Sequence, residues 1–256
     1  MIVLNMDMDN TIIYSYKKDI GKDKITAEIY KGHGISYITG KTYRLLSSLK
    51  EKLLLVPTST RTASQYKRIN LGIGDIKYAL VCNGGVLLED GRKNEEWYKE
   101  SLRIIKDSIP ELGRAMRFLE KDSRRESELR FIDGLFVFTK CNQPEDVVLD
   151  LKDILDNTLV DVLDNGEKIY VVPVALNKGA AVERLKRYIN ADIVIAAGDS
   201  RFDIPMLKAA DIRLAPYGFT KKFGIDFRAE EAGSNEIFSE FLLNYCLDCQ
   251  IPHSNL

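Results

Sequence analysis

The chain has 256 residues, of which 45% are hydrophobic and 29% charged, an ordinary globular composition that excludes a largely disordered protein. Its 37 Lys and Arg residues balance 38 Asp and Glu residues, and this near-neutral charge argues against nucleic acid as a partner. Its apolar runs are far shorter than the ~20 residues of a membrane span. Since the first residues also lack a secretory signal, we expect a soluble, cytoplasmic protein with no membrane partner.

The first third of the chain alternates apolar runs typical of buried strands with segments of helical periodicity. Between the predicted strand at 2–6 and the predicted helix at 42–53, residues 11–39 contain three extended stretches and a Gly-bearing turn, which predict a small hairpin. The other predicted elements are a strand at 2–6, a helix at 42–53, a strand at 53–57, a helix at 63–69 and a strand at 78–82. This alternation is typical of an α/β protein with a parallel sheet.

The pattern changes after Asn83–Gly84–Gly85 and returns at Lys178. The intervening segments are predicted helices at 108–120 and 144–157 and extended stretches at 129–139, 159–163 and 168–172. The later elements are helices at 179–189 and 204–210, strands at 193–197 and 212–215, and an amphipathic helix near the C-terminus. We therefore predict an α/β fold, a Rossmann-like parallel-sheet core (residues 1–85 and 174–256) with an inserted α+β cap (residues 86–173).

Polar residues gather just beyond the apolar runs of the predicted core. They are Asp7 and Asp9 after the first strand, Thr58 to Arg61 after the second, Lys178 at the start of a helix, and Asp199, Ser200 and Asp203 after the run 193–197. In an open α/β sheet, ligands bind beyond the carboxyl ends of the strands. We therefore expect these clusters to share one site.

The residue types in these clusters suggest phosphate chemistry. Asp7 and Asp9 are two residues apart, so their side chains leave an extended backbone on the same side. With Asp199 they form a set of carboxylates that repel one another unless a cation joins them, and hard oxygen ligands favour Mg²⁺. A lysine and a hydroxyl opposite the metal would hold a phosphate dianion. One carboxylate can then attack phosphorus while its neighbour transfers the proton.

These motifs resemble those of the haloacid dehalogenase superfamily of phosphohydrolases. The four matching segments are Asp7-Met8-Asp9-Asn10-Thr11, Ser59-Thr60-Arg61, Asn177-Lys178-Gly179 and Gly198-Asp199-Ser200-Arg201-Phe202-Asp203. The insert between the second and third motifs resembles the subclass with Cof-type, sucrose-phosphate and mannosyl-phosphoglycerate phosphatases and eukaryotic phosphomannomutases. The resemblance implies a phosphatase that acts on a small phosphorylated metabolite, with a sugar phosphate as the expected substrate.

The resemblance also implies roles for individual residues. Asp7 would form an aspartyl-phosphate, and Asp9 would protonate the leaving oxygen and then activate water. The phosphoryl group would be held by Ser59, with Thr60 beside it, and by Lys178. The implied Mg²⁺ ligands are Asp7, the backbone carbonyl of Asp9, Asp199 and Asp203, the last through water or by orienting Lys178. The inserted module would be a lid that covers the site and contacts the leaving group.

Three positions depart from the usual family pattern. Phe202 stands where the fourth motif commonly has Asn, and Asn10 stands where Gly is common. Thr58 precedes Ser59 and competes with it as the phosphate-binding hydroxyl.

Within the insert, aromatic and cationic residues could meet a sugar or a second anionic group. Those candidates are Arg103 and Arg130, together with Trp97, Tyr98 and Lys140.

Other interpretations use the same residues. A mutase would return the phosphoryl group from Asp7 to a sugar, and a non-enzymatic phosphoacceptor module would share the acidic cluster, hydroxyl and lysine. Receiver modules of that last kind are about half this length and lack an inserted lid.

Cys246 and Cys249 form a CxxC followed by His253, but the helical spacing around them favours a terminal helix over a zinc site.

Overall fold

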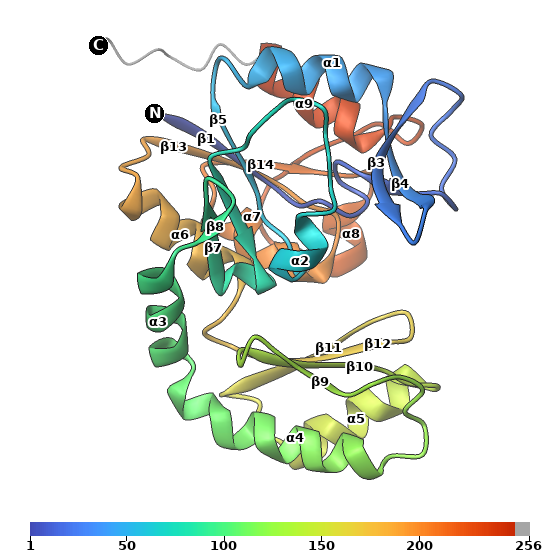
Figure 1. Ribbon diagram of the computed structural model, residues 1–256, viewed down its shortest axis with the longest axis vertical. Helices are drawn as coiled ribbons and strands as arrows, with labels where there is room; N and C mark the ends of the chain where they lie inside the picture. The colour runs from blue at the N-terminus through green and yellow to red at the C-terminus, as the bar shows by residue number, and fades with distance from the viewer. Residues whose placement is uncertain (249–256) are drawn as a thin grey trace.

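The computed structural model describes residues 1–248. Figure 1 shows a larger body that contains the N-terminus and the last helix, and a smaller body that faces it across a gap spanned by two chain segments. The larger body is built on a parallel sheet of five strands in the order β15-β14-β13-β1-β5. These strands are β1 (Ile2–Met6), β5 (Leu54–Pro57), β13 (Ile193–Ala197), β14 (Ile212–Ala215) and β15 (Glu230–Glu231).

Alternate residues of the parallel sheet enter two separate apolar clusters, as the two-residue period of a strand requires. Leu4 and Ile195 pack on one face with α1 (Gly40–Leu49) and α9 (Phe238–Asp248). Val3 and Val194 pack on the other with α6 (Lys178–Tyr188) and α7 (Ile204–Ala209). Both faces are therefore covered by helices, and the predicted α/β core is confirmed.

The predicted hairpin is also confirmed. It is an antiparallel sheet in the order β2-β4-β3, formed by β2 (Tyr14–Ser15), β3 (Lys24–Tyr30) and β4 (His33–Thr39). The main-chain amide of Asn70 donates to the carbonyl of Ala27, so the chain after α2 (Ala63–Tyr66) is tied to β3. The hairpin thus stands beside the segment that carries the second motif.

The segment after the second motif differs from the sequence prediction. The strand predicted at 78–82 exists as β6 (Tyr78–Val81), but it pairs antiparallel with β7 (Val86–Glu89) in a separate sheet completed by β8 (Arg92–Lys93). Helix α3 (Glu95–Ile104) was not predicted.

Tertiary contacts explain why the sequence pattern did not indicate α3. Most of its positions are polar, and its one large buried side chain is that of Trp97. The Trp97 indole donates to the carbonyl of Gly84 at 3.0 Å, and the guanidinium of Arg184 on α6 lies 3.9 Å from the ring centroid. Packing on α6 therefore supports a helix that has few apolar side chains of its own.

The smaller body is an antiparallel sheet in the order β11-β12-β10-β9, covered on one face by two helices. Its elements are α4 (Ile109–Lys121), β9 (Arg130–Ile132), β10 (Phe136–Lys140), α5 (Pro144–Ile154), β11 (Val160–Asn165) and β12 (Lys168–Pro173). Val137 and Val171 pack with Leu112 and Val147 beneath the helices. The other sheet face turns toward the parallel sheet, as the lower half of Figure 1 shows.

Short elements complete the described chain. They are the 3₁₀ turns at Cys82–Gly84, Lys106–Ser108 and Arg201–Asp203, and α8 (Phe219–Phe223). The predicted terminal helix is confirmed as α9, which includes Cys246, whereas Cys249 and His253 lie outside the described residues. Across residues 1–248, the structure has no helix with the length and apolar character needed to cross a membrane.

Candidate active site

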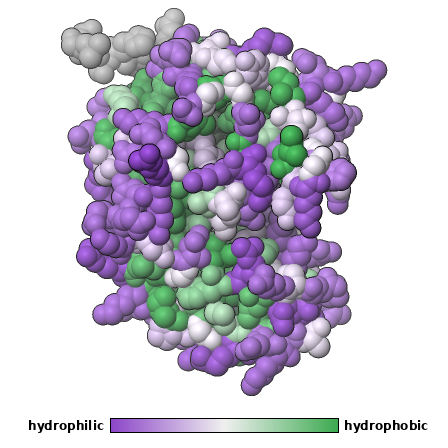
Figure 2. Space-filling view, viewed as in Figure 1, coloured by the Kyte–Doolittle hydropathy of each residue, from purple (hydrophilic) through white to green (hydrophobic). Residues whose placement is uncertain are grey.

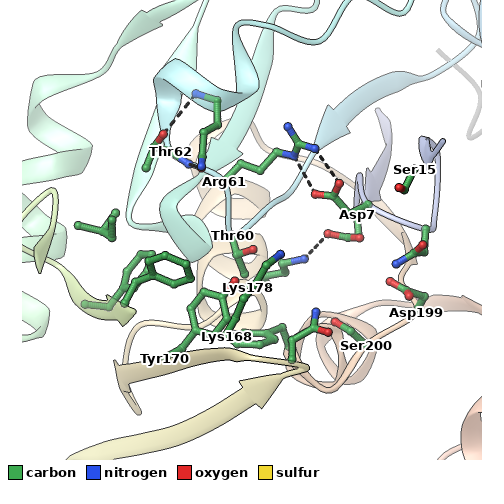
Figure 3. Close-up of a pocket in the computed structure, with 18 of the residues that line it drawn as sticks. Asp7, Ser15, Thr60, Arg61, Thr62, Lys168, Tyr170, Lys178, Asp199 and Ser200 are labelled. Carbon is green, nitrogen blue, oxygen red and sulfur yellow. Dashed lines mark hydrogen bonds and ion pairs between the residues drawn. The ribbon is translucent and has the colours of Figure 1, made fainter. Parts of the chain in front are cut away.

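A cavity of about 410 Å³ lies between the carboxyl ends of the parallel strands and the free face of the antiparallel sheet. Asp7, Lys178 and Asp199 line its wall on the larger body, whereas Arg130 and Tyr170 line the opposite wall. Figure 3 shows Asp7, Lys178 and Asp199 on one side of this space and Tyr170 on the other. Figure 2 shows hydrophilic side chains around the outline of this view of the molecule, with apolar patches between them in both its upper and its lower half. The predicted clusters therefore do share a site.

Asp7 and Asp9 are placed by a tight turn that follows β1. The main-chain amide of Asp7 donates to the carbonyl of Ala197, which aligns the ends of β1 and β13. The next residues curl back, with the amides of Ile12 and Ile13 donating to the carbonyl of Met8. Asn10 has a φ of 60° within this turn, a conformation that Gly adopts freely and Asn tolerates best among the other residues. The departure from Gly at position 10 therefore preserves the turn.

Lys178 joins two carboxylates in the interior. Its ammonium lies 2.5 Å from Asp7 Oδ1 and 2.5 Å from Asp203 Oδ1, and its side chain is only 1% exposed. Asn177 caps the helix that Lys178 opens, accepting a hydrogen bond from the amide of Ala180. Burial lowers the pKa of Lys178, but the charges of Asp203 and Asp7 outweigh burial and raise the pKa above its ordinary value. The lysine is therefore held as a cation.

Asp203 shapes the loop that carries Asp199. Its Oδ2 accepts hydrogen bonds from the amides of Asp199 and Ser200 at 3.1 and 2.9 Å and from the Ser200 hydroxyl at 2.8 Å. A Cβ at Gly198 would lie 2.3 Å from the Cβ of Asp203, so the strand end and the loop meet where only glycine fits. With both oxygens engaged, Asp203 positions Lys178 on one side and the Asp199 loop on the other.

The buried carboxylates form a set that fits a divalent cation. One oxygen each of Asp7, Asp199 and Asp203 lies within 4.8 Å of the others. Burial raises the pKa of Asp7 well above its usual range, although Lys178 opposes the shift. Burial, and then the charge of Asp203, raises the pKa of Asp199 to about 7. Three carboxylates beside one ammonium are a donor set of hard oxygens suited to an ion such as Mg²⁺.

Asp9 is held by Arg61, a member of the second-motif cluster for which the sequence indicated no role of its own. Arg61 Nε and Nη2 each lie 2.7 Å from an oxygen of Asp9, a bidentate pair. The third nitrogen of the same guanidinium, Nη1, lies 2.9 Å from Glu28, which also pairs with Arg68 at 3.0 Å. Burial raises the pKa of Asp9, but the hydrogen bonds and charge of Arg61 prevail and lower it. Asp9 is thus held ionised in this arrangement.

The three hydroxyls of the second motif occupy different places. Thr58 is buried and donates to Asn5 Oδ1 and to a main-chain carbonyl, so it points into the core. Ser59 is also buried, and its hydroxyl accepts a hydrogen bond from the amide of Arg61. Thr60 lines the cavity and lies near Lys178 in Figure 3. The geometry therefore favours Thr60 for contact with a bound anion, with Ser59 behind it.

Of the residues singled out in the insert, Arg130 lines the cavity and the others do not. Arg103 on α3 pairs with Glu100, and its side chain is 74% exposed, away from the site. Trp97 packs on α6, Tyr98 donates to the carbonyl of Asp133, and Lys140 pairs with Glu167.

Sequence reasoning missed Asn165, Lys168 and Tyr170, which line the cavity from β11 and β12. Their alternation along each strand would have grouped them on one face, but the periodicity alone does not say which face meets the core.

Phe202 has a role that its departure from the usual motif did not predict. Its ring lies 5.1 Å from that of Tyr170 in an edge-on contact, and Tyr170 in turn lies 5.1 Å from Phe138. All three rings line the cavity. The aromatic residue in the fourth motif therefore joins the larger body to the antiparallel sheet.

Comparison with solved structures identifies the fold. Sucrose-phosphatase from Synechocystis sp., in complex with sucrose and phosphate, superposes with a TM-score of 0.65 over 96% of this chain and 97% of that one, at 15% identity. A Thermoplasma acidophilum protein gives a TM-score of 0.62 over 96% of both chains, also at 15% identity. A trehalose-6-phosphate phosphatase related protein gives 0.53 over the same shares and at the same identity. These similarities cover both bodies and establish the fold.

Comparison of sequences gives a family and two distant relatives. A family model of haloacid dehalogenase-like hydrolases matches residues 93–215. Phosphoglycolate phosphatase from Methanopyrus kandleri is 26% identical over 188 residues, which are 71% of this chain and 77% of that protein. An α,α-trehalose-phosphate synthase from Dictyostelium discoideum is 20% identical over 143 residues. That match covers 54% of this chain and spans only 18% of the synthase.

Proposed function

We propose that this chain is a haloacid dehalogenase-like hydrolase, as the family model that matches residues 93–215 supports, and that it is a Mg²⁺-dependent phosphatase acting on a small phosphorylated metabolite, with a sugar phosphate as the expected class. The observation that carries the proposal is the pairing of the buried Lys178 with Asp7 and Asp203. Asp9 and Asp199 line the same cavity as Asp7 and Lys178. The names of the sucrose, trehalose and phosphoglycolate phosphatases among the similar proteins support a small phosphate ester as substrate.

The first half-reaction transfers the phosphoryl group to Asp7. A carboxylate oxygen of Asp7 forms a bond to phosphorus as the bond from phosphorus to the leaving oxygen breaks. Lys178 and Thr60, with Ser59 behind Thr60, hold the phosphoryl oxygens, and Lys178 reduces their repulsion with Asp7. Asp9 gives its proton to the leaving oxygen, for which it must first separate from Arg61 and be protonated.

The second half-reaction regenerates the enzyme. Water attacks the phosphorus of the aspartyl-phosphate, Asp9 accepts a proton from that water, and the Asp7 carboxylate is released together with inorganic phosphate. A Mg²⁺ held by Asp7, Asp199 and the main-chain carbonyl of Asp9 would neutralise charge on the phosphoryl oxygens. In this scheme Asp203 positions Lys178 and the Asp199 loop.

The antiparallel sheet supplies the second wall of the site. We propose that residues 86–173 act as a cap that covers the cavity and excludes water during the first half-reaction. Within that range, β7 and β8 pair with β6 of the larger body, and the antiparallel sheet comes after α3 in the chain.

The test is phosphate release from a panel of phosphate monoesters, with Mg²⁺ or with EDTA, by the wild type and by Asp7→Asn. We expect release that needs Mg²⁺ and falls at least about 10³-fold in the variant, which keeps the shape of the side chain but removes the nucleophile. Release that survives EDTA or Asp7→Asn would contradict the proposal. Transfer from one sugar to another without free phosphate would indicate the mutase instead.

A further inference from the structure

The free face of the cap sheet is defined by the pairing of its strands. Arg130 on β9 pairs with Phe138 on β10, and Phe138 pairs with Tyr170 on β12. Paired residues project to the same side of a sheet, so these three side chains form one row across it. All three line the cavity, which fixes this side as the one that faces Asp7.

A second, parallel row lies two residues along each strand. Lys168 on β12 pairs with Asn165 on β11 and with Lys140 on β10. Because the side-chain period of a strand is two, Lys168 projects to the same side as Tyr170. Lys168 and Asn165 line the cavity, whereas Lys140 pairs with Glu167 outside it. Figure 3 shows Lys168 and Tyr170 extending from the cap strands into the cavity.

The face of the cap sheet that lines the cavity carries positive charge and no negative charge. The cap residues that line the cavity include Arg130 and Lys168 but no carboxylate. Within the described chain, residues 1–248, neither cation forms a salt bridge, although other lysines and arginines at the site, such as Lys178 and Arg61, do. Both are exposed to the cavity. A bound substrate would displace water from these two cations, and loss of water from an unpaired charge costs free energy. A substrate with a negatively charged group would offset that cost, so this face is suited to an anion.

We propose that Arg130, Lys168 and Asn165 form a site for a second anionic group, a carboxylate or a phosphate, carried by the leaving group of the substrate. The phosphoryl group to be removed lies against Asp7 and Lys178, and the aromatic pair Phe138 and Tyr170, which belongs to the first row with Arg130, forms an apolar floor for the carbon skeleton. The guanidinium can bind either anion in bidentate fashion, and the amide and ammonium donate further hydrogen bonds. The substrate class is thus a phosphorylated acid or a bisphosphate. This inference rests on the proposed phosphatase function.

The test compares substrates in matched pairs. One pair is glycerol phosphate and phosphoglycerate, and the other is a hexose monophosphate and the bisphosphate of the same hexose. We expect the wild type to favour the member with the second anion by about tenfold or more in kcat/KM, the effect of one charge-assisted hydrogen bond. The pair with the larger preference distinguishes carboxylate from phosphate. Equal or reversed preference in both pairs would overturn the inference.

Variants locate the site. Arg130→Met and Lys168→Met should each raise KM by about tenfold or more for the member with the second anion. The change should be smaller for the member without it, and Arg130→Lys should recover part of the loss of Arg130→Met. Lys140→Met is the matched control, because Lys140 lies on the same sheet face outside the cavity, and it should behave as wild type. Equal losses for both members of a pair would overturn the inference.

An activated aryl phosphate separates the two proposals. If the wild type releases phosphate from it but shows no preference within the pairs, the anion site is wrong and the phosphatase stands. If the wild type releases no phosphate from the aryl ester or from any member of the pairs, the phosphatase is wrong and the inference fails with it.

Discussion

On the core wall of the cavity, Asp7 and Lys178 are buried, and Lys178 pairs with Asp7 and with Asp203 behind it. On the cap wall, Arg130 and Lys168 are exposed and form no salt bridge within residues 1–248. A buried pair fixes geometry, and removing one partner leaves an uncompensated charge. An exposed cation contributes little to stability but is ready to bind an anion. Under the proposed function, the core wall carries out the chemistry and stabilises the fold, whereas the cap wall selects the substrate.

The largest effect should follow from Lys178→Met. The change leaves Asp7 and Asp203 buried beside each other without a cation, so we expect the free energy of unfolding to fall by about 3–5 kcal/mol and phosphate release to be lost. Urea denaturation and phosphate release measure the two effects.

Lys186→Met is the control for that variant, because Lys186 lies on the same helix and pairs with Asp211 at the surface. It should cost less than about 1 kcal/mol and leave activity unchanged. Equal stability of the two variants would contradict the difference between buried and exposed charges.

An intermediate effect is expected for Glu28→Gln. The Glu28 side chain is fully buried between Arg61 and Arg68, which are themselves 14% and 32% exposed. We expect a loss of about 2 kcal/mol, less than for Lys178 because water reaches both arginines. Glu230→Gln removes an exposed partner of Arg228 and should change stability by less than about 1 kcal/mol. A Glu28 variant as stable as the Glu230 variant would show that this network contributes no net stability.

The last effect appears only in the metal-free protein, as a dependence of stability on pH. The pKa of Asp199 is about 7 in the fold against about 3.9 in the unfolded chain. Because a raised pKa favours the protonated form, the fold loses stability as the pH rises from about 4 to 7. Asp199→Asn removes that loss, so its Tm in EDTA should exceed that of the wild type by several degrees at pH ~8, about 2–4 °C for each kcal/mol, and by little at pH ~4.

Mg²⁺ provides the contrast for that prediction. Added Mg²⁺ should raise the Tm of the wild type at the higher pH more than that of Asp199→Asn, because the wild type offers the additional carboxylate. A difference in Tm between the two proteins that stays constant with pH would contradict the assigned direction of the Asp199 pKa.

The sequence was most informative where local patterns and motifs coincide. The strand before Asp7, the strand before Gly198 and the helix opened by Lys178 were predicted from apolar runs and periodicity, and the structure places their polar ends together. Each motif lies within a few residues of a predicted strand or helix, so its place at the carboxyl edge of the sheet could be inferred from the sequence.

Contacts between distant segments could not be predicted in the same way. The pairing of Lys168 with Asn165 and Lys140 depends on strand register, and the contact of Phe202 with Tyr170 depends on how the cap meets the core. Likewise Arg61 reaches Glu28 only because the hairpin stands beside the second motif. Such contacts arise from tertiary packing, for which a single sequence holds no local signal.

The central claim, that Asp7 is the nucleophile, is tested most directly by acid quenching during turnover, followed by mass spectrometry of the peptide that contains Asp7. We expect a phosphoryl group on Asp7 in the wild type. With an activated aryl phosphate, whose leaving group needs no proton, we expect a larger fraction in Asp9→Asn, because that variant lacks the base that activates water for the second half-reaction. Phosphate release without any phosphorylated Asp7, or with the phosphoryl group on another residue, would contradict the account.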